Sequence, residues 1–405
     1  MHVMAKRKMI TGNSELMRNL NRTLIIKTIM ERGKISRSEI ENFTSLTMPT
    51  VMRIVESLME EGLVIEVGKG SSSGGRRPTM LQMNPSSMYF IGVSVRRVLI
   101  VVLTDVSGNI ISRYECHTKY DDTTETVLEQ ILHGFDHVIR SSGVNPSKLV
   151  AASIGLPGTK FKHKSLKSEY PFDNWANFDK KSWVDSAKFP CPVEIENIAR
   201  LGALGELVFG IGQKERNFIY IFVDYGVGSG SVVNGKLFTG NNGVAGELGH
   251  MVINDGGYPC YCGNKGCLEM YCSTFAIINN ILSDQKADPK LVQKLRLNKD
   301  FNYVIKAAHQ GDELATRLIK DSARMLGIGI SNIINLLNPA MIILGGELPD
   351  NYPEYMKIST PFISDGIFRN LANDVLITPS KLGNNSQVMG AVALAMAKVF
   401  DHMNH

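Results

Sequence analysis

Hydrophobic residues recur at helical spacing in three short segments within the first 60 residues. Leucines and isoleucines between residues 16 and 29 place a hydrophobic face on a first helix, and Gly33 ends this pattern. Ser36 and Glu39 have the spacing of a capping box, in which the serine side chain accepts an early helical N–H and the glutamate accepts the N–H of the cap residue. The sequence therefore predicts a second, short helix over about residues 37–43.

A third helix is indicated by a hydrophobic stripe over residues 51–58. Thr47 is suited to the N-cap position of this helix. Pro49 is tolerated in the first turn, because the N–H that proline lacks would have no partner there. The side facing solvent would then carry Thr47, Met48, Thr50, Met52 and Arg53.

Alternating residues after the third helix predict a two-stranded hairpin. Residues 63–67 and 79–83 alternate as strands, and residues 68–75 between them are rich in glycine and serine. Three helices and a hairpin in this order predict a winged helix-turn-helix domain over residues 1–85, whose third helix enters the DNA major groove. We expect Thr50 and Arg53 to contact bases. The expected DNA-binding residues are Thr47, Met48, Thr50, Arg53, Lys69, Arg76 and Arg77, the last three on phosphates or in the minor groove.

The distribution of charge favours a DNA-binding domain over a helical bundle or loop without a DNA-binding role. Each element alone would also fit a plain helical bundle or a solvated loop. Residues 1–85, however, carry 13 lysines and arginines against 8 acidic residues, whereas residues 86–405 carry 31 of each. The whole net charge of +5 therefore lies in the N-terminal segment, as expected for a polyanion-binding head on a neutral body.

From Tyr89 onward, predicted strands and helices alternate. Apolar runs indicate a three-stranded meander over residues 89–111, and helices are expected over residues 199–207, 301–337 and 387–400. This alternation is typical of an α/β fold. Further strands are predicted at residues 149–154, 191–195, 217–223 and 341–344.

Composition limits the class of protein. A chain of 405 residues with 43% hydrophobic and 20% charged residues is expected to be globular, with two or three domains. The most apolar segments, residues 91–103 and 325–344, are interrupted by arginines or asparagines. We therefore expect no signal peptide, no membrane span and a cytoplasmic protein.

Four of the six cysteines lie within 13 positions, which in a chain of this class favours a metal site over disulfides. The motif Glu247-Leu-Gly-His250 precedes Cys260, Cys262 and Cys267. One imidazole and three thiolates are suited to tetrahedral Zn²⁺ at a closed structural site, so these four residues are the predicted zinc ligands. The remaining cysteines, Cys116, Cys191 and Cys272, are expected in the core.

These motifs resemble those of the ROK family, which is named for repressors, open reading frames and kinases. The resemblance covers nearly the whole chain, including the helix-turn-helix that the repressor branch carries and the sugar kinases lack. It rests on Gly155-Leu-Pro-Gly158, Glu196-Asn197, Gly226-Val-Gly-Ser-Gly230, Asn234-Gly-Lys236, Gly246-Glu-Leu-Gly-His250, the cysteine cluster, and Asn338-Pro339 before Gly345-Gly346.

The resemblance implies a two-lobed actin-like ATPase fold of the ribonuclease H-like type. The first lobe would comprise residues 86–198 together with a C-terminal helix over 386–405, and the second lobe residues 199–385 with the zinc site. Sugar would bind in the cleft between the lobes. The sugar-contacting positions implied by the family are Gly158, Asn197, Glu247, His250 and Glu269.

The residue types at these positions agree with a sugar site. Carboxylates and amides form paired hydrogen bonds with sugar hydroxyls, and leaving one such buried group unpaired costs about 1–3 kcal/mol, which allows discrimination among sugars. Glu247 and Glu269 also flank the metal loop, so a bound zinc ion would hold them in place.

Three departures from the family kinases predict that the chain does not transfer phosphate. The kinases have an aspartate directly after the asparagine, where this chain has Ile198, which cannot accept a proton. Their first phosphate loop is a turn of small residues, where this chain has the bulky Ser94-Val-Arg-Arg-Val98. In the second phosphate loop, Asp224 would repel a phosphate unless a cation intervened.

The expected function is therefore that of a sugar-responsive transcriptional repressor of carbohydrate-utilisation genes, not of an enzyme. Its partners would be a double-stranded DNA operator and a small sugar or sugar derivative, and the reading of two half-sites implies a homodimer or homotetramer. Two alternatives stay open: a sugar kinase with an appended DNA-binding domain, and a repressor released by a sugar-transport protein.

Overall fold

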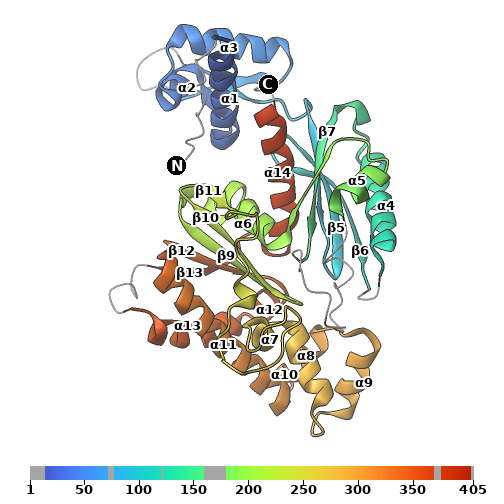
Figure 1. Cartoon of the computed structure of the whole chain (residues 1–405). Helices are drawn as coiled ribbons and strands as arrows, with labels where there is room; N and C mark the ends of the chain where they lie inside the picture. The colour runs from blue at the N-terminus through green and yellow to red at the C-terminus, as the bar shows by residue number, and fades with distance from the viewer. Residues whose placement is uncertain (1–13, 72–76, 120–121, 159–178, 369–374, 403–405) are drawn as a thin grey trace, which may run out of the picture.

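The protein has a small helical head at one end of a body that contains two five-stranded sheets (Figure 1). The computed structural model describes residues 14–71, 77–119, 122–158, 179–368 and 375–402. No helix within these ranges is both long and apolar enough to cross a membrane.

The head contains the predicted elements in the predicted order. Its helices are α1 (Ser14–Arg32), α2 (Arg37–Thr44) and α3 (Met48–Glu60). The capping box of α2 is present, since the Ser36 side chain accepts the Glu39 N–H while Glu39 accepts the Ser36 N–H. Strands β2 (Val64–Lys69) and β3 (Thr79–Met83) form the hairpin.

One strand of the head was not predicted. The two-residue strand β1 (Ile35–Ser36) pairs antiparallel with β3, so the sheet of the head has three strands, with Ile35 opposite Leu81. Two residues are too few to show alternation in a sequence. The pairing closes the hairpin onto the helices, because Ile35 and Leu81 are both buried in the hydrophobic core of the head.

The first lobe of the body is a sheet with the strand order β6-β5-β4-β7-β8. Its meander is antiparallel, and β7 and β8 continue it in parallel. Strand β8 starts two residues later than predicted because Pro192, which lacks an N–H, precedes it. The elements are β4 (Tyr89–Ser94), β5 (Val98–Asp105), β6 (Ile110–His117), α4 (Thr124–Ser142), β7 (Leu149–Leu156), α5 (Lys180–Ser186) and β8 (Val193–Asn197).

The second lobe repeats this topology in the order β11-β10-β9-β12-β13. Its meander is again antiparallel, with β12 and β13 in parallel. Neither β10, β11 nor β13 was predicted from the sequence. The strands are β9 (Phe218–Val223), β10 (Val227–Val233), β11 (Lys236–Phe238), β12 (Met341–Gly345) and β13 (Leu376–Pro379).

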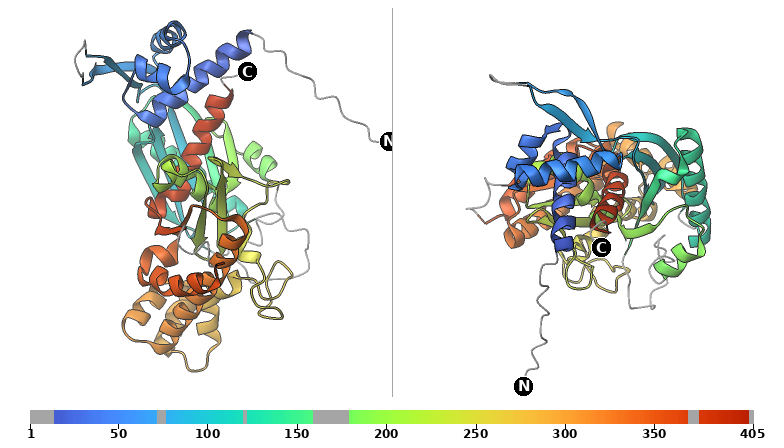
Figure 2. Two further views of the ribbon diagram at one scale, coloured as in Figure 1. Left: turned by 90° about the vertical axis from the view of Figure 1, so that its left-hand side faces the viewer. Right: turned by 90° about the horizontal axis from the view of Figure 1, so that it is seen from above.

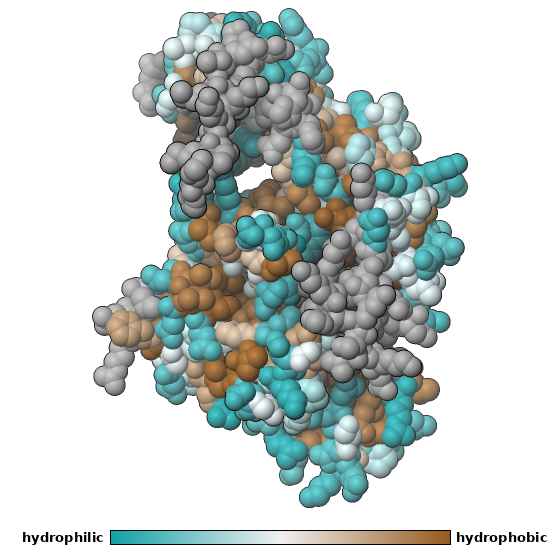
Figure 3. All heavy atoms as spheres, viewed as in Figure 1, coloured by the Kyte–Doolittle hydropathy of each residue, from teal (hydrophilic) through white to brown (hydrophobic). Residues whose placement is uncertain are grey.

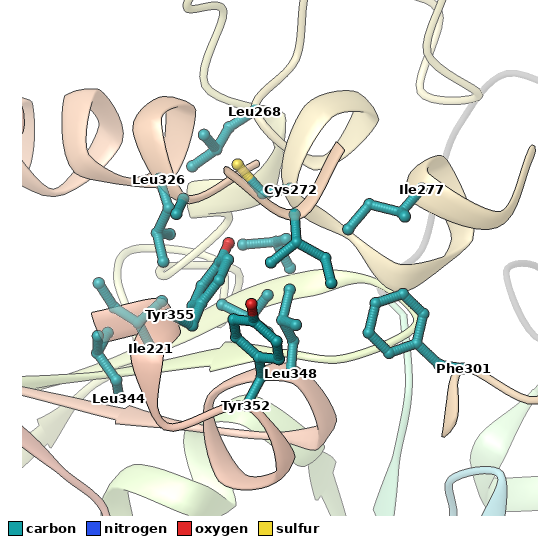
Figure 4. Close-up of a cluster of buried hydrophobic side chains, with 14 of the residues drawn as sticks. Ile221, Leu268, Cys272, Ile277, Phe301, Leu326, Leu344, Leu348, Tyr352 and Tyr355 are labelled. Carbon is teal, nitrogen blue, oxygen red and sulfur yellow. The ribbon is translucent and has the colours of Figure 1, made fainter. Parts of the chain in front are cut away.

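Helices cover both faces of the second sheet. Helix α6 (Ile198–Val208) lies on one face, and the core on the other face joins Ile221 and Leu344 of the sheet to Leu326 of α11 (Figure 4). The predicted helix over 301–337 is broken at Gly311, whose φ of +90° a helix does not allow. The remaining helices are α7 (Glu269–Cys272), α8 (Thr274–Ser283), α9 (Pro289–Asn298), α10 (Asn302–His309), α11 (Glu313–Leu337), α12 (Glu347–Asn351) and α13 (Glu354–Gly366).

Helix α14 (Ser386–His402) connects all three parts of the molecule (Figures 1 and 2). It packs on β4 and β7 of the first sheet and crosses α6. At its far end the Phe400 carbonyl accepts the Thr23 hydroxyl of α1 at 3.5 Å, and the Phe400 ring lies 6.5 Å from that of Phe90. The hydrophobic core of the head therefore continues without interruption into α14 and the first sheet.

Candidate functional site

The predicted metal ligands come together in the structure. His250 ends a 3₁₀ turn (Leu248–His250), and the three cysteines lie on the loop that follows. The ligand atoms of His250, Cys260, Cys262 and Cys267 all lie within 4.8 Å of one another. The Cys262 and Cys267 sulfurs are 3.6 Å apart, close to the edge of about 3.7 Å of a tetrahedron with Zn–S bonds of about 2.3 Å. This group can hold a metal ion.

The backbone of the cysteine loop holds these ligands in place. The Cys260 N–H donates to the Asn264 carbonyl at 2.8 Å, and the Gly263 N–H donates to the Cys260 carbonyl at 3.0 Å. Gly266 has a φ of +78°, and a Cβ there would lie 1.7 Å from the Asn254 carbonyl oxygen. Only glycine fits at this position, so the turn between the ligands is fixed by the sequence.

The protonation of the group follows from its burial. Burial lowers the pKa of His250, so the imidazole is neutral and has a lone pair for a metal. Burial also raises the pKa of Cys267 to about 11 and raises the pKa of Cys260. In the metal-free protein the thiols of Cys260 and Cys267 are therefore protonated, and a binding metal ion would displace these protons.

Glu269 lies next to the metal group and is almost completely buried, with 3% of its surface exposed. One carboxylate oxygen accepts the Val227 N–H at 2.6 Å, and the other accepts the Tyr261 hydroxyl. The same hydroxyl lies 3.4 Å from His250 Nε2, while His250 Nδ1 lies 3.6 Å from the Cys260 sulfur. One nitrogen of His250 thus faces the thiols and the other faces Glu269 and Tyr261.

Asn197 is joined to this region through α6 and β10. Its side-chain oxygen caps α6 by accepting the N–H groups of Ala199 and Arg200 at 2.9 and 3.3 Å. Strand β10 packs closely on α6, since a Cβ on Gly228 would lie 2.9 Å from the Ala199 Cβ. The residue before Gly228 is Val227, which donates to Glu269. Strand β10 therefore packs on the helix that Asn197 caps and also donates an N–H to Glu269.

Gly158 and Glu247 lie at exposed positions. Gly158 follows β7 with a φ of +78°, and nothing lies within 4 Å of where its Cβ would be. Glu247 precedes the turn that carries His250. Buried Arg200 holds the nearby backbone by donating to the Ala245 carbonyl at 3.4 Å and to Glu196 at 2.9 Å. The sequence reasoning had assigned no role to Arg200 or to Tyr261.

A second polar cluster joins the two lobes. The turn between β4 and β5 carries Arg96, whose guanidinium lies 3.2 Å from Asp224 directly after β9, both side chains being about 10% exposed. Arg97 of the same turn lies 3.2 Å from Asp300 and 3.7 Å from Glu347. Asp224 was predicted to repel a phosphate unless a cation intervened, and the guanidinium of Arg96, from the other lobe, is a cation beside it.

Two carboxyl groups at this cluster, Glu347 and Asp350, have raised pKa values. Burial, together with the nearby charge of Asp224, raises the pKa of Glu347 to about 8, while Arg97 opposes the shift. Burial also raises the pKa of Asp350 to about 6. Proton loss from Glu347 is therefore unfavourable in the folded protein at neutral pH.

The predicted DNA-binding residues lie on α3 and on the hairpin. Thr47 and Arg53 are exposed, whereas Met48 and Thr50 are half-buried, and the Thr47 hydroxyl lies 3.0 Å from that of Thr50. Lys69 and Arg77 are exposed on either side of the hairpin loop. Arg76 lies outside the described residues.

Comparison with known proteins decides the family. The sequence model of the ROK family matches residues 95–398. The chain belongs to the ROK family. This ROK protein is 33% identical to the xylose repressor of Bacillus spizizenii over 96% of its own chain and 98% of the relative. It is also 29% identical to the DNA-binding transcriptional dual regulator NagC of Escherichia coli, over 95% and 94% of the two chains.

Solved structures of the ROK family resemble this chain to different extents. The crystal structure of a ROK family transcriptional regulator, a homolog of the E. coli MLC protein, has a TM-score of 0.75 at 25% identity and covers 96% of this chain and 98% of its own. A ROK family glucokinase from Streptomyces griseus, in complex with glucose and AMPPNP, has a TM-score of 0.62 at 26% identity. It covers 76% of this chain and 99% of its own.

We predict that Cys262→Ser lowers the zinc content of the purified protein. The wild type should retain about one zinc ion per chain, because four ligands saturate a structural site, and the variant should lose most of it. Metal analysis by mass spectrometry checks this. Cys191→Ser, which changes a half-buried cysteine outside the group, should keep the wild-type content. Equal zinc in all three proteins would contradict the assignment.

Glu347→Gln should change how folding stability depends on pH. The carboxyl has a reference pKa of 4.5 and a pKa of about 8 when folded, so the folded chain retains its proton longer and stability falls as pH rises between these values. The variant cannot titrate there. Its thermal midpoint relative to wild type should therefore increase between pH 5 and pH 8. Glu354→Gln, at an exposed carboxyl, should change the thermal midpoint relative to wild type less over this pH range. A Glu347→Gln midpoint that differs from wild type by the same amount at pH 5 and pH 8 would refute the raised pKa of Glu347.

Proposed function

We propose that this ROK protein is a DNA-binding repressor of carbohydrate-utilisation genes whose operator affinity depends on a sugar bound between its lobes. The observation that carries this proposal is coverage. Similarity to the xylose repressor extends over 96% of this chain. The glucokinase structure matches over 99% of its own length but covers only 76% of this chain. The family domain begins at residue 95, and the head lies before it.

The head is proposed to act as a winged helix-turn-helix. Its three helices, its hairpin and the excess of positive charge before residue 86 support this role. Helix α3 would read bases with Thr50 and Arg53, beside Thr47 and Met48. The hairpin would contact phosphates or the minor groove through Lys69, Arg76 and Arg77.

The proposed sugar site comprises Gly158, Asn197, Glu247, His250 and Glu269. Buried Glu269 next to His250, and Asn197 fixed as the N-cap of α6, support a site with fixed hydrogen-bonding groups. Zn²⁺ at His250, Cys260, Cys262 and Cys267 would supply a rigid support. The ligand set and its spacing fit this ion, which would fix the loop next to Glu269.

Loss of catalysis is part of the proposal. Ile198, at the position of the kinase base, is buried and cannot accept a proton. The turn that would receive phosphate holds Arg96 and Arg97, and their guanidinium groups are already paired with Asp224 and Asp300. An incoming nucleotide would have to break these pairs and approach several carboxylates.

Control of DNA binding would pass through the shared core. Sugar bound between the lobes would favour one lobe arrangement, and α14, whose end lies in the core of the head, would transmit it. In a homodimer this would change the spacing of two heads on two half-sites. An exposed hydrophobic group on the second lobe offers a surface for self-association (Figure 3): Leu336, Leu337, Phe368 and Leu376.

The proposed function predicts linkage between sugar and operator. An operator is first selected from fragmented genomic DNA, and its affinity for the protein is then measured with and without D-xylose, D-glucose and N-acetyl-D-glucosamine. One of these should change the affinity by about 5- to 150-fold. Arg53→Ala should weaken operator binding by about 10- to 100-fold while leaving sugar binding intact. Arg140→Ala, which removes an exposed charge on α4, should have no effect.

The outcomes of this measurement separate the candidates. Operator affinity that stays constant while a sugar demonstrably binds would refute sugar control. A protein–operator complex that no sugar dissociates, but that a membrane sugar-transport protein does dissociate, would support the partner-controlled alternative.

Phosphate transfer distinguishes repressor from kinase. We expect no transfer from magnesium ATP to these sugars above the rate without protein, because the base and the phosphate turn are both replaced. The assay follows labelled phosphate into sugar, with a ROK glucokinase as positive control. Measurable turnover would reject the proposal that the body has lost catalysis.

A further inference from the structure

The buried carboxylate of Glu269 needs hydrogen-bond donors whether or not a sugar is present. It is 3% exposed, and an unsatisfied charged group at such burial is strongly unfavourable. The structure supplies the Val227 N–H on one oxygen and the Tyr261 hydroxyl on the other. The first donor belongs to a sheet strand and is fixed, whereas the second is at the end of a side chain.

Tyr261 reaches both side chains that the proposed function assigns to sugar hydroxyls in this part of the site. Its hydroxyl donates to Glu269 and lies 3.4 Å from His250 Nε2. The two rings are edge-to-face, with centroids 5.3 Å apart at 80°. A phenol hydroxyl between a carboxylate and an imidazole has the same hydrogen-bonding capacity as one hydroxyl of a sugar.

The backbone around Tyr261 is held on both sides. It lies between Cys260 and Cys262, two members of the metal group, and the Cys260 N–H is bonded to the Asn264 carbonyl. Movement of the phenol away from Glu269 is therefore a rotation of the side chain and does not need the loop to unfold. Tyr261 itself is half-buried, so the ring has a path towards solvent.

We propose that Tyr261 is a specificity-determining residue that takes the place of a sugar hydroxyl in the sugar-free protein and is displaced when the effector binds. This inference rests on the proposed sugar site. A sugar then binds well only if it offers its own hydroxyl to Glu269, because a sugar lacking that group would not replace the hydrogen bond that Glu269 loses when the phenol leaves. The phenol thereby selects for sugars with a hydroxyl that can replace its hydrogen bond to Glu269.

Tyr261→Phe tests the proposal, because the direction of the change in sugar affinity distinguishes a competing hydroxyl from one that contacts the sugar. The variant keeps the ring but removes the competing hydroxyl, so D-xylose or N-acetyl-D-glucosamine should bind at least about 10-fold more tightly in calorimetric titration of the full chain. Tyr258→Phe is the matched control, because Tyr258 is on the same loop with 51% of its surface exposed, and its sugar affinity should equal that of wild type. Zinc content and thermal midpoint verify that both variants are folded.

The other outcomes of this titration also decide the proposal. Weaker binding by Tyr261→Phe would mean that the hydroxyl contacts the sugar, and unchanged binding would mean that it does not compete. If wild type binds neither sugar but the variant does, displacement is supported; if neither protein binds, it is rejected. Failure of the proposed function would be seen differently, because the affinity for the operator would be the same with and without a sugar that the protein binds.

Discussion

Two helices of the body cross with almost no side chains between them, and the arrangement of the other parts depends on this contact. A Cβ on Gly390 of α14 would lie 1.7 Å from the Leu201 carbonyl, and one on Gly205 of α6 would lie 2.1 Å from the Ser386 carbonyl. Beside the crossing, fully buried Glu206 accepts the hydroxyls of Ser380 and Ser386. Close packing of this kind permits little adjustment, so α6 and α14 move together.

This crossing joins the proposed sensor to the proposed DNA reader. Helix α6 begins at Asn197, and α14 ends against the core of the head. Elsewhere at the lobe junction, Arg96 and Arg97 of the first lobe form ion pairs with Asp224 and Asp300 of the second lobe. The junction is therefore held by packed backbone at the helix crossing and by paired charges at the turn of Arg96 and Arg97.

What the sequence could predict was largely local. The capping box at Ser36, the helical stripes of the head and the spacing of the metal ligands involve residues near one another in the chain, and all have counterparts in the structure. Strand β10 was missed because its glycines, which allow close packing on α6, hide the alternation of a strand. The pairing of Arg97 with Asp300, 203 positions apart, has no local signal. Tyr261 could have been suspected, since a phenol between two predicted ligand cysteines must lie near the predicted metal site.

The position of Phe400 has a consequence for biogenesis. The head is made first, yet its hydrophobic core is completed by α14, and the bond from Thr23 to Phe400 spans 377 positions. During translation the emerging head lacks this cover while the body is still being synthesised. The hydrophobic core of the head can therefore be completed only after the body has been synthesised, so folding of the proposed DNA reader is coupled to synthesis of the proposed sensor.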